Sequence, residues 1–125
     1  MRLQKSSSSL LLFDFIMSNN EVSESNHLIL TCDVDKNESL IHSYALVDTD
    51  VIGYAFVDYD FVRCHHLLVY KLKEPRAIEV IDERSIELEL ITHMTKLTMT
   101  IENHREKISM FITKLGHYPI VLRLP

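Results

Sequence analysis

Two carboxylates and a hydroxyl directly follow a short apolar run near the middle of the chain. In the stretch SYALVDTDVIGYAF, the run Ala45–Val47 leads into Asp48, Thr49 and Asp50. A carboxylate held at the end of a buried strand can act as a general acid or base toward a bound substrate. Aspartate and threonine are also common in solvent-exposed turns. The pattern therefore leaves two interpretations open, a catalytic turn and an ordinary surface turn.

A second group of chemically capable residues is Cys64-His65-His66, with Asp58 and Asp60 upstream. Structural zinc sites usually need four ligands at preferred spacing, and adjacent residues on a helix point in different directions. We therefore expect no metal site here. No glycine-rich phosphate loop occurs in the chain, so we expect no cofactor either.

Composition narrows the classes of partner. The chain has 125 residues, of which 46% are hydrophobic and 25% charged, and its net charge is −5. One soluble domain of ordinary composition fits these values. A net negative charge is unfavourable for binding nucleic acid or an anionic membrane surface, so neither partner is expected. The two cysteines, Cys32 and Cys64, form no CxxC pattern, which favours reduced thiols and an intracellular, cytoplasmic setting.

The first 26 residues differ from the rest. Arg2 and Lys5 precede the apolar segment Leu10–Met17, an order that also occurs in secretory signal peptides. Asp14 interrupts the apolar segment, and the polar residues after it contain no small-residue cleavage site. No run is long enough to span a membrane. We expect residues 1–26 to be a poorly ordered leader and linker, and residues 27–125 to form the domain.

Alternating apolar residues and turn signals predict strands in most of the domain. Residues 97–101 fit either a half-buried strand or an exposed edge strand. Asp58 or Asp60 is available to cap a short helix, and Pro75 is expected at an edge or a turn. The fold class predicted from this order is an all-β barrel or sandwich with one short helix. The expected strands span residues 27–34, 40–48, 77–81, 86–104 and 107–115, and the expected helix spans residues 58–68.

Three stretches, in this order, resemble the retropepsin-like aspartic protease domain of gypsy-type (LTR) retrotransposon polyproteins. ALVDTDVIGYAFVDYDFV is similar to the family's catalytic strand and turn, in which two hydrophobic residues precede Asp-Ser/Thr-Gly-Ala. EPRAIEVIDERSIELELITHMTKLTMTI is similar to the strand, flap and returning strand, and FITKLGHYPIVLRLP to the family's late strand. The resemblance covers residues 28–125. It implies a closed barrel, one lobe of the acid protease fold.

The resemblance also implies a mechanism. Asp48 falls on the catalytic aspartate, and Thr49 on the hydroxyl that braces the two turns of a homodimer. Each subunit then supplies one carboxylate to a shared pair that cleaves a peptide or polyprotein substrate without a cofactor or metal. The flap is expected around residues 81–90. The flap residues expected to contact substrate are Ile81, Asp82, Glu83, Arg84, Ser85 and Ile86.

Several positions depart from the family's pattern. Asp50 stands where the family has glycine in the turn, ahead of Val51, and Arg123 replaces a glycine of the late strand. Glu83 and Glu89 stand where flaps often have glycine, and would stiffen and charge the tip. The family's C-terminal helix is expected to be missing after residue 125. We therefore expect weak or absent hydrolysis. The alternatives are a pseudo-protease that binds peptides without cleaving them and a non-functional retrotransposon relic.

Overall fold

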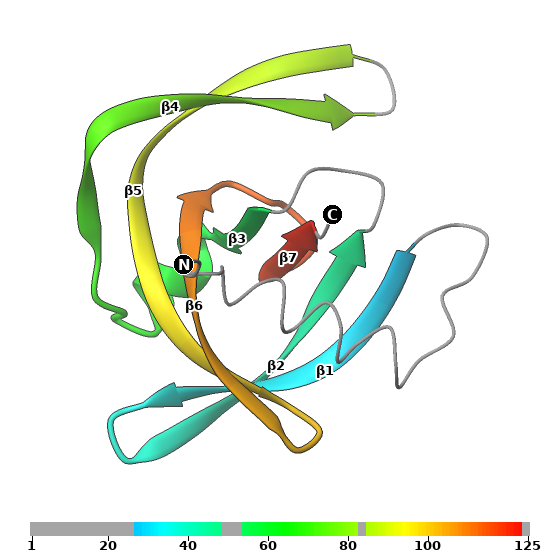
Figure 1. Ribbon diagram of the computed structural model, residues 1–125, viewed down its shortest axis with the longest axis vertical. Helices are drawn as coiled ribbons and strands as arrows, with labels where there is room; N and C mark the ends of the chain where they lie inside the picture. The colour runs from blue at the N-terminus through cyan, green and yellow to red at the C-terminus, as the bar shows by residue number, and fades with distance from the viewer. Residues whose placement is uncertain (1–26, 49–53, 83–84, 124–125) are drawn as a thin grey trace, which may run out of the picture.

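Strands dominate the part of the chain that the computed structural model describes, residues 27–48, 54–82 and 85–123 (Figure 1). One short helix interrupts them. The elements are β1 (His27–Lys36), β2 (Ser39–Asp48), β3 (Tyr54–Asp58), α2 (Tyr59–Cys64), β4 (Tyr70–Asp82), β5 (Ser85–Ile101), β6 (His104–Thr113) and β7 (Ile120–Arg123). The expected leader, residues 1–26, lies outside the described residues.

Six of the described strands close into a ring. The sheet order is β1-β2-β7-β3-β6-β5-β4, and β1 pairs a second time, with β5, at Asp33↔Thr100 and Val34↔Met99. This second pairing joins the two ends of the six-strand series β1-β2-β7-β3-β6-β5. The strand β4 is added outside the ring, against β5. The prediction of an all-β closed barrel with one short helix is confirmed.

The interior of the barrel is filled by alternate residues of its strands, as the two-residue period of a strand requires. Removing such side chains from water is the main favourable contribution to folding, at roughly 1.5–3 kcal/mol for each large side chain. The buried residues of this first core are Cys32, Val34, Ala45, Val47, Ala55, Val57, Val62, Leu97, Met99, Ile101, Ile108, Met110, Ile120 and Leu122.

A second, smaller core lies on the other face of β3 and β7. Phe56 and Val121 alternate with residues of the first core and pack instead against Ile78 of β4 and Ile91 of β5. Phe56 also contacts the ring of Phe111, with centroids 6.1 Å apart. Strands buried on both faces read as continuous apolar runs, which explains AFV in β3 and IVL in β7. The paired residues 76–82 of β4 and 85–91 of β5, which we call the arm, thus pack through Ile78 and Ile91 against the outside of the barrel.

Two strand predictions need correction. The expected strand 77–81 is part of the longer β4, which contains Pro75 within a break in register between Lys71 and Arg76. Proline has no N–H to donate, so it is tolerated at an irregularity of an edge strand. For residues 97–101, the interpretation as a half-buried strand is confirmed and the alternative of an exposed edge is wrong, because they pair with β6 along their length and with β1 at Met99 and Thr100.

The helix α2 is shorter than expected because its end is closed by a Schellman motif. The N–H of His66 donates to the carbonyl of Arg63, and the N–H of Leu67 donates to the carbonyl of Val62. His66 has a φ of 52°, the left-handed conformation that usually requires glycine at this position. The usual sequence signal for a helix end is therefore missing from this stretch.

Asp58 connects three elements. One carboxylate oxygen accepts the N–H of Asp60 at 3.1 Å and caps α2, and the other accepts the N–H of Leu115 at 2.8 Å. Its own N–H donates to the carbonyl of Pro119 at 2.8 Å. The end of β3, the start of α2 and the connection from β6 to β7 thus meet at one residue. Of the two predicted caps, Asp58 is the one used.

The two thiols lie in opposite environments, since Cys32 is buried in the barrel and Cys64 is exposed at the end of α2. Burial, with a smaller contribution from the charge of Asp33, raises the pKa of Cys32 from 9.0 to about 12. The folded state therefore keeps this proton to a higher pH than the unfolded state does. The resulting stabilisation is complete below pH 9.0 and is lost as the pH rises toward about 12.

Replacing Asp58 with alanine is expected to lower the free energy of unfolding by about 2–3 kcal/mol, because two hydrogen bonds are removed. Asp58→Asn should lose about half as much, since its single carbonyl oxygen can accept only one of them. Urea denaturation followed by circular dichroism measures both changes. Asp60→Ala is the matched control, because the side chain of Asp60 is 63% exposed and its ion pair with Arg63 is long, at 3.6 Å. Equal losses for Asp58→Ala and Asp60→Ala would contradict this role.

Iodoacetamide at pH 8 is expected to modify Cys64 rapidly and to leave Cys32 unmodified until the chain unfolds, because only a thiolate that reaches solvent reacts. Mass spectrometry of the digested protein separates the two sites. Between pH 9.0 and about 12, the stability of a Cys32→Ala variant should, in addition, decline less than that of wild type, because the contribution of this thiol is absent. Rapid modification of Cys32 in the folded protein would show that the barrel interior is open to reagent.

Candidate active site

The strand β2 ends at Asp48, between two neighbouring strands. Asp48 pairs with His27 of β1 on one side and, in the parallel direction, with Arg123 of β7 on the other. Arg123 also pairs with Tyr54, the first residue of β3. The last residue of β2 and the first residue of β3 are thus both in register with the same residue of β7. Thr49, Asp50 and Val51, the other predicted residues of the turn, lie outside the described residues.

The position of Asp48 follows from the burial of the residues before it. Ala45 and Val47 are buried in the barrel, and Leu46 packs against the second core on the opposite face. Both faces of β2 are therefore covered by apolar residues over Ala45–Val47, just before its last position. The apolar run before Asp48 is a strand with little choice of register, because a slip of one residue would exchange its two faces. The prediction of a strand at this point is confirmed.

The predicted flap corresponds to the end of the arm. Ile81 pairs with Ile86 and Asp82 with Ser85, so two residues, Glu83 and Arg84, connect the strands. Those two connecting residues lie outside the described residues. The predicted flap residues are thus brought together as one antiparallel hairpin. Figure 1 shows this hairpin above the ends of β2 and β7 in the view drawn there.

The expectation that Glu89 charges the tip of the flap is wrong. Glu89 lies within β5, four residues after Ser85, and pairs with Ile78 of β4, which is buried in the second core. It is half-buried and stands where the arm joins the barrel. The charge of Glu89 therefore lies at the base of the arm and not at its end.

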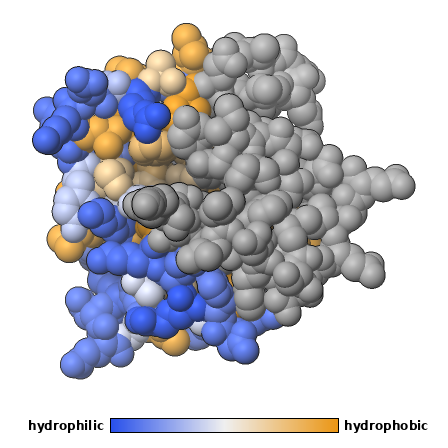
Figure 2. Space-filling view, viewed as in Figure 1, coloured by the Kyte–Doolittle hydropathy of each residue, from blue (hydrophilic) through white to orange (hydrophobic). Residues whose placement is uncertain are grey.

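Two large apolar side chains of the arm are left in solvent. Leu88 is 70% exposed and Leu90 is 65% exposed, although Ile91 next to them is 1% exposed. Figure 2 shows hydrophobic surface at the upper end of the molecule, where the arm lies, and mostly hydrophilic surface at the lower end. The alternation of residues 86–90 indicates one apolar face of a strand, but it does not reveal that the barrel leaves this face uncovered.

The Cys64-His65-His66 group is dispersed by the end of α2. Cys64 is exposed, His65 packs against Phe61 with ring centroids 4.6 Å apart, and His66 begins the next segment with its left-handed backbone. Within residues 27–48, 54–82 and 85–123, no three histidine, cysteine or acidic side chains are placed so that they could hold a metal ion together. The same part of the chain contains no helix with the length and hydrophobicity needed to cross a membrane.

Comparison with known protein families places the chain in one of them. The family model described as the PEG10/RTL1 protease domain matches residues 44–125, more than half of the chain. The match begins just before the apolar run of β2 and includes Asp48, the arm and β7. No curated protein matches the chain. The chain belongs to the PEG10/RTL1 protease domain family, the retropepsin-like domains derived from retrotransposon gag-pol polyproteins.

Proposed function

We propose that this protein is a retroelement-derived aspartic endopeptidase domain that works as a homodimer, with Asp48 as the catalytic carboxylate of each subunit. The observation that carries this proposal is the place of Asp48 at the end of a doubly covered strand, with β7 pairing to the strands on both sides of the turn. The family match over residues 44–125 supports the same assignment.

The chemistry needs two copies of the chain because each copy contributes one such aspartate. Two carboxylates about 3 Å apart cannot both ionise, so the pair holds one shared proton and titrates as a unit. The ionised carboxylate takes a proton from a water molecule, which attacks the carbonyl carbon of the scissile peptide. The protonated carboxylate donates its proton to the carbonyl oxygen. Thr49 braces the two turns across the dimer axis.

The arm supplies the substrate specificity in this proposal. A substrate that lies extended beneath it would cover the exposed faces of Leu88 and Leu90 and would exclude water from the carboxylate pair. Removing these two side chains from water favours peptides with large apolar residues near the scissile bond. The hairpin of residues 81–86 closes over the substrate.

Two residues are proposed to hold the hydrolytic rate down. Asp50 adds a second negative charge to each turn, so four carboxylates meet near the dimer axis and oppose association until some are protonated. Arg123 occupies the position in register with Asp48 on the adjacent strand. A guanidinium that pairs with a carboxylate of this turn would hold it ionised and remove the shared proton that the mechanism requires.

The same pairing in register of Asp48 and Arg123 favours a second candidate, a pseudo-protease that binds extended peptides without hydrolysis. Main-chain hydrogen bonds to the arm would supply the affinity, as in other cases of strand addition. This candidate differs from the first in one respect. Its affinity for peptides does not depend on the ionisation or the identity of residue 48.

Cleavage of a peptide library by the purified chain is expected to be slow and to increase from pH 7 toward pH 4, because protonation restores the shared proton and relieves repulsion at the axis. Asp48→Asn should abolish it, since an amide cannot act as the base. Mass spectrometry detects the products, and sedimentation velocity at each pH reports the dimer.

Three outcomes separate the candidates. Cleavage that disappears in Asp48→Asn supports the endopeptidase. Peptide binding of equal affinity in wild type and Asp48→Asn, without products from either, supports the pseudo-protease. Folded protein that neither cleaves nor binds the library removes both and leaves the relic.

Leu88→Ser and Leu90→Ser are each expected to lower kcat/KM for apolar peptides about tenfold, because a hydrophobic substrate contact is lost. Stability should change by no more than about 0.5 kcal/mol, since both side chains are mainly exposed. Leu40→Ser is the matched control: Leu40 is 52% exposed near the hairpin between β1 and β2. Loss of peptide binding replaces kcat/KM as the measurement where hydrolysis is absent. Equal effects at Leu40 and Leu88 would contradict a specific role of the arm.

A further inference from the structure

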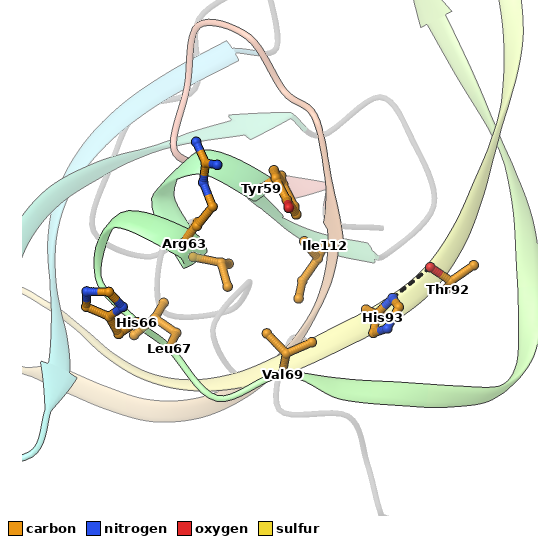
Figure 3. Close-up of a pocket in the computed structure, with 9 residues that line it drawn as sticks. Tyr59, Arg63, His66, Leu67, Val69, Thr92, His93 and Ile112 are labelled. Atoms are coloured by element: carbon orange, nitrogen blue, oxygen red, sulfur yellow. Dashed lines mark hydrogen bonds between the residues drawn. The ribbon is translucent and has the colours of Figure 1, made fainter.

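A pocket of about 500 Å³ lies beside α2, on elements other than those that carry Asp48 and the flap hairpin. Its volume is within the range of roughly 300–1,000 Å³ that is usual for ligand sites. The helix α2 forms one wall of the pocket. The segment after the helix and β5 form a second wall, and Ile112 of β6 also lines the pocket. Figure 3 shows Tyr59, Leu67, Val69 and Ile112 around the central space.

The rim of the pocket is apolar and exposed. Tyr59 is 55% exposed and Val69 is 48% exposed, and both line the pocket. Leu68 and Tyr70, on either side of Val69 in the sequence, are 75% and 45% exposed. Contiguous exposed apolar side chains around a concavity are typical of a binding surface. An apolar group that enters this pocket would remove several of them from water together.

Three of the side chains that line the pocket are basic. Arg63, His66 and His93 line it, and none of its nine lining residues is acidic, although the chain as a whole has a net charge of −5. Arg63 has one long ion pair, 3.6 Å to Asp60, and its side chain is 71% exposed. His93 is held by Thr92, whose hydroxyl oxygen is 2.7 Å from its Nδ1 (Figure 3). The pocket thus suits an apolar ligand that carries a negative charge.

The chain itself contains a segment of that chemistry. Leu10–Met17, LLLFDFIM, has seven apolar residues and a single charge, Asp14. The nine residues 18–26 connect this segment to β1, and nine extended residues reach roughly 30 Å. This is more than twice the radius of gyration of about 13 Å expected for a domain of about 100 residues. A connector of this length adds little closure entropy and lets the segment reach a pocket well beyond the start of β1.

We propose that the pocket binds Leu10–Met17 of the same chain, with apolar side chains in the space between Tyr59, Val69 and Ile112 and Asp14 beside Arg63. The complementarity has two independent parts. The apolar lining matches a segment that would otherwise expose seven apolar residues. The basic rim matches the one acid within it. This docking does not depend on peptide hydrolysis, and it engages a surface apart from the hairpin of residues 81–86.

The native thiols allow a direct test on the full chain. A nitroxide label attaches to Cys64, which is exposed next to Arg63 and does not line the pocket, whereas Cys32 is buried and is not labelled. In the ¹⁵N-labelled protein, the amide signals of residues 10–17 should be broadened more than those of residues 18–26. Val69→Glu places a carboxylate in the pocket and should remove this broadening. Ile29→Glu, at a position that is 56% exposed and outside the pocket lining, is the matched control and should retain it.

Charge reversal tests the proposed ion pair. Asp14→Lys and Arg63→Glu should each lower the docked-to-free ratio about two- to fivefold, the range for a partly exposed ion pair, and the double variant should restore it. Circular dichroism checks the fold of each variant. Equal broadening in wild type and Val69→Glu, or broadening spread evenly over residues 1–26, would overturn the proposal. Broadening of unlabelled ¹⁵N chains mixed with labelled ¹⁴N chains would assign the segment to a second copy, and that result would overturn it as well.

Discussion

The hydrogen bonds of Asp58, from both its carboxylate and its backbone N–H, are the interactions on which the geometry of the site depends most directly. Its two oxygens hold backbone N–H groups of Asp60 and Leu115, which belong to different elements, and the N–H of Asp58 holds Pro119 just before β7 begins. The register of β7 is thereby set at its first residue. Because β7 pairs with both β2 and β3, this register decides which residue lies beside Asp48. A shift of one residue would exchange the faces of β7 and place Val121 in the barrel.

Much of the fold could be predicted because its signals are local. Alternation identified β1, β2, β5, β6 and the end of β4, but not β3 or β7. The polar turns identified the hairpins, and Asp58 was recognised as a possible cap. Closure of the barrel could not be predicted from these signals, since it depends on two contacts between residues more than 60 positions apart, Asp33↔Thr100 and Val34↔Met99. The second core was missed for a related reason: the packing of Phe56 against Ile91 joins strands that are not neighbours in the sheet.

The candidate site divides in the same way. The order of three motifs identified the family, because residue type and sequence order are visible in one dimension, and the apolar run identified the strand that ends at Asp48. The placement of Glu89 was misjudged, because only the register of β4 against β5 shows that it lies at the base of the arm. The pocket beside α2 was not foreseen at all. Its residues come from the helix, the segment after it, β5 and β6, and none of these stretches carries a motif that indicates a shared surface.

The length of β5 has a mechanical consequence. Its C-terminal half is a stave of the barrel, between β1 and β6, while the residues from Ser85 to His93 pair only with β4 among the described strands. The arm is therefore attached to the barrel at one end, where Ile78 and Ile91 pack against Phe56 and Val121. Bending it breaks no hydrogen bond of the closed ring. Any tilt of the arm against the barrel must therefore loosen the packing of the second core and the contact of Arg76 with the ring of Phe111, whose centroid lies 5.4 Å from the guanidinium carbon.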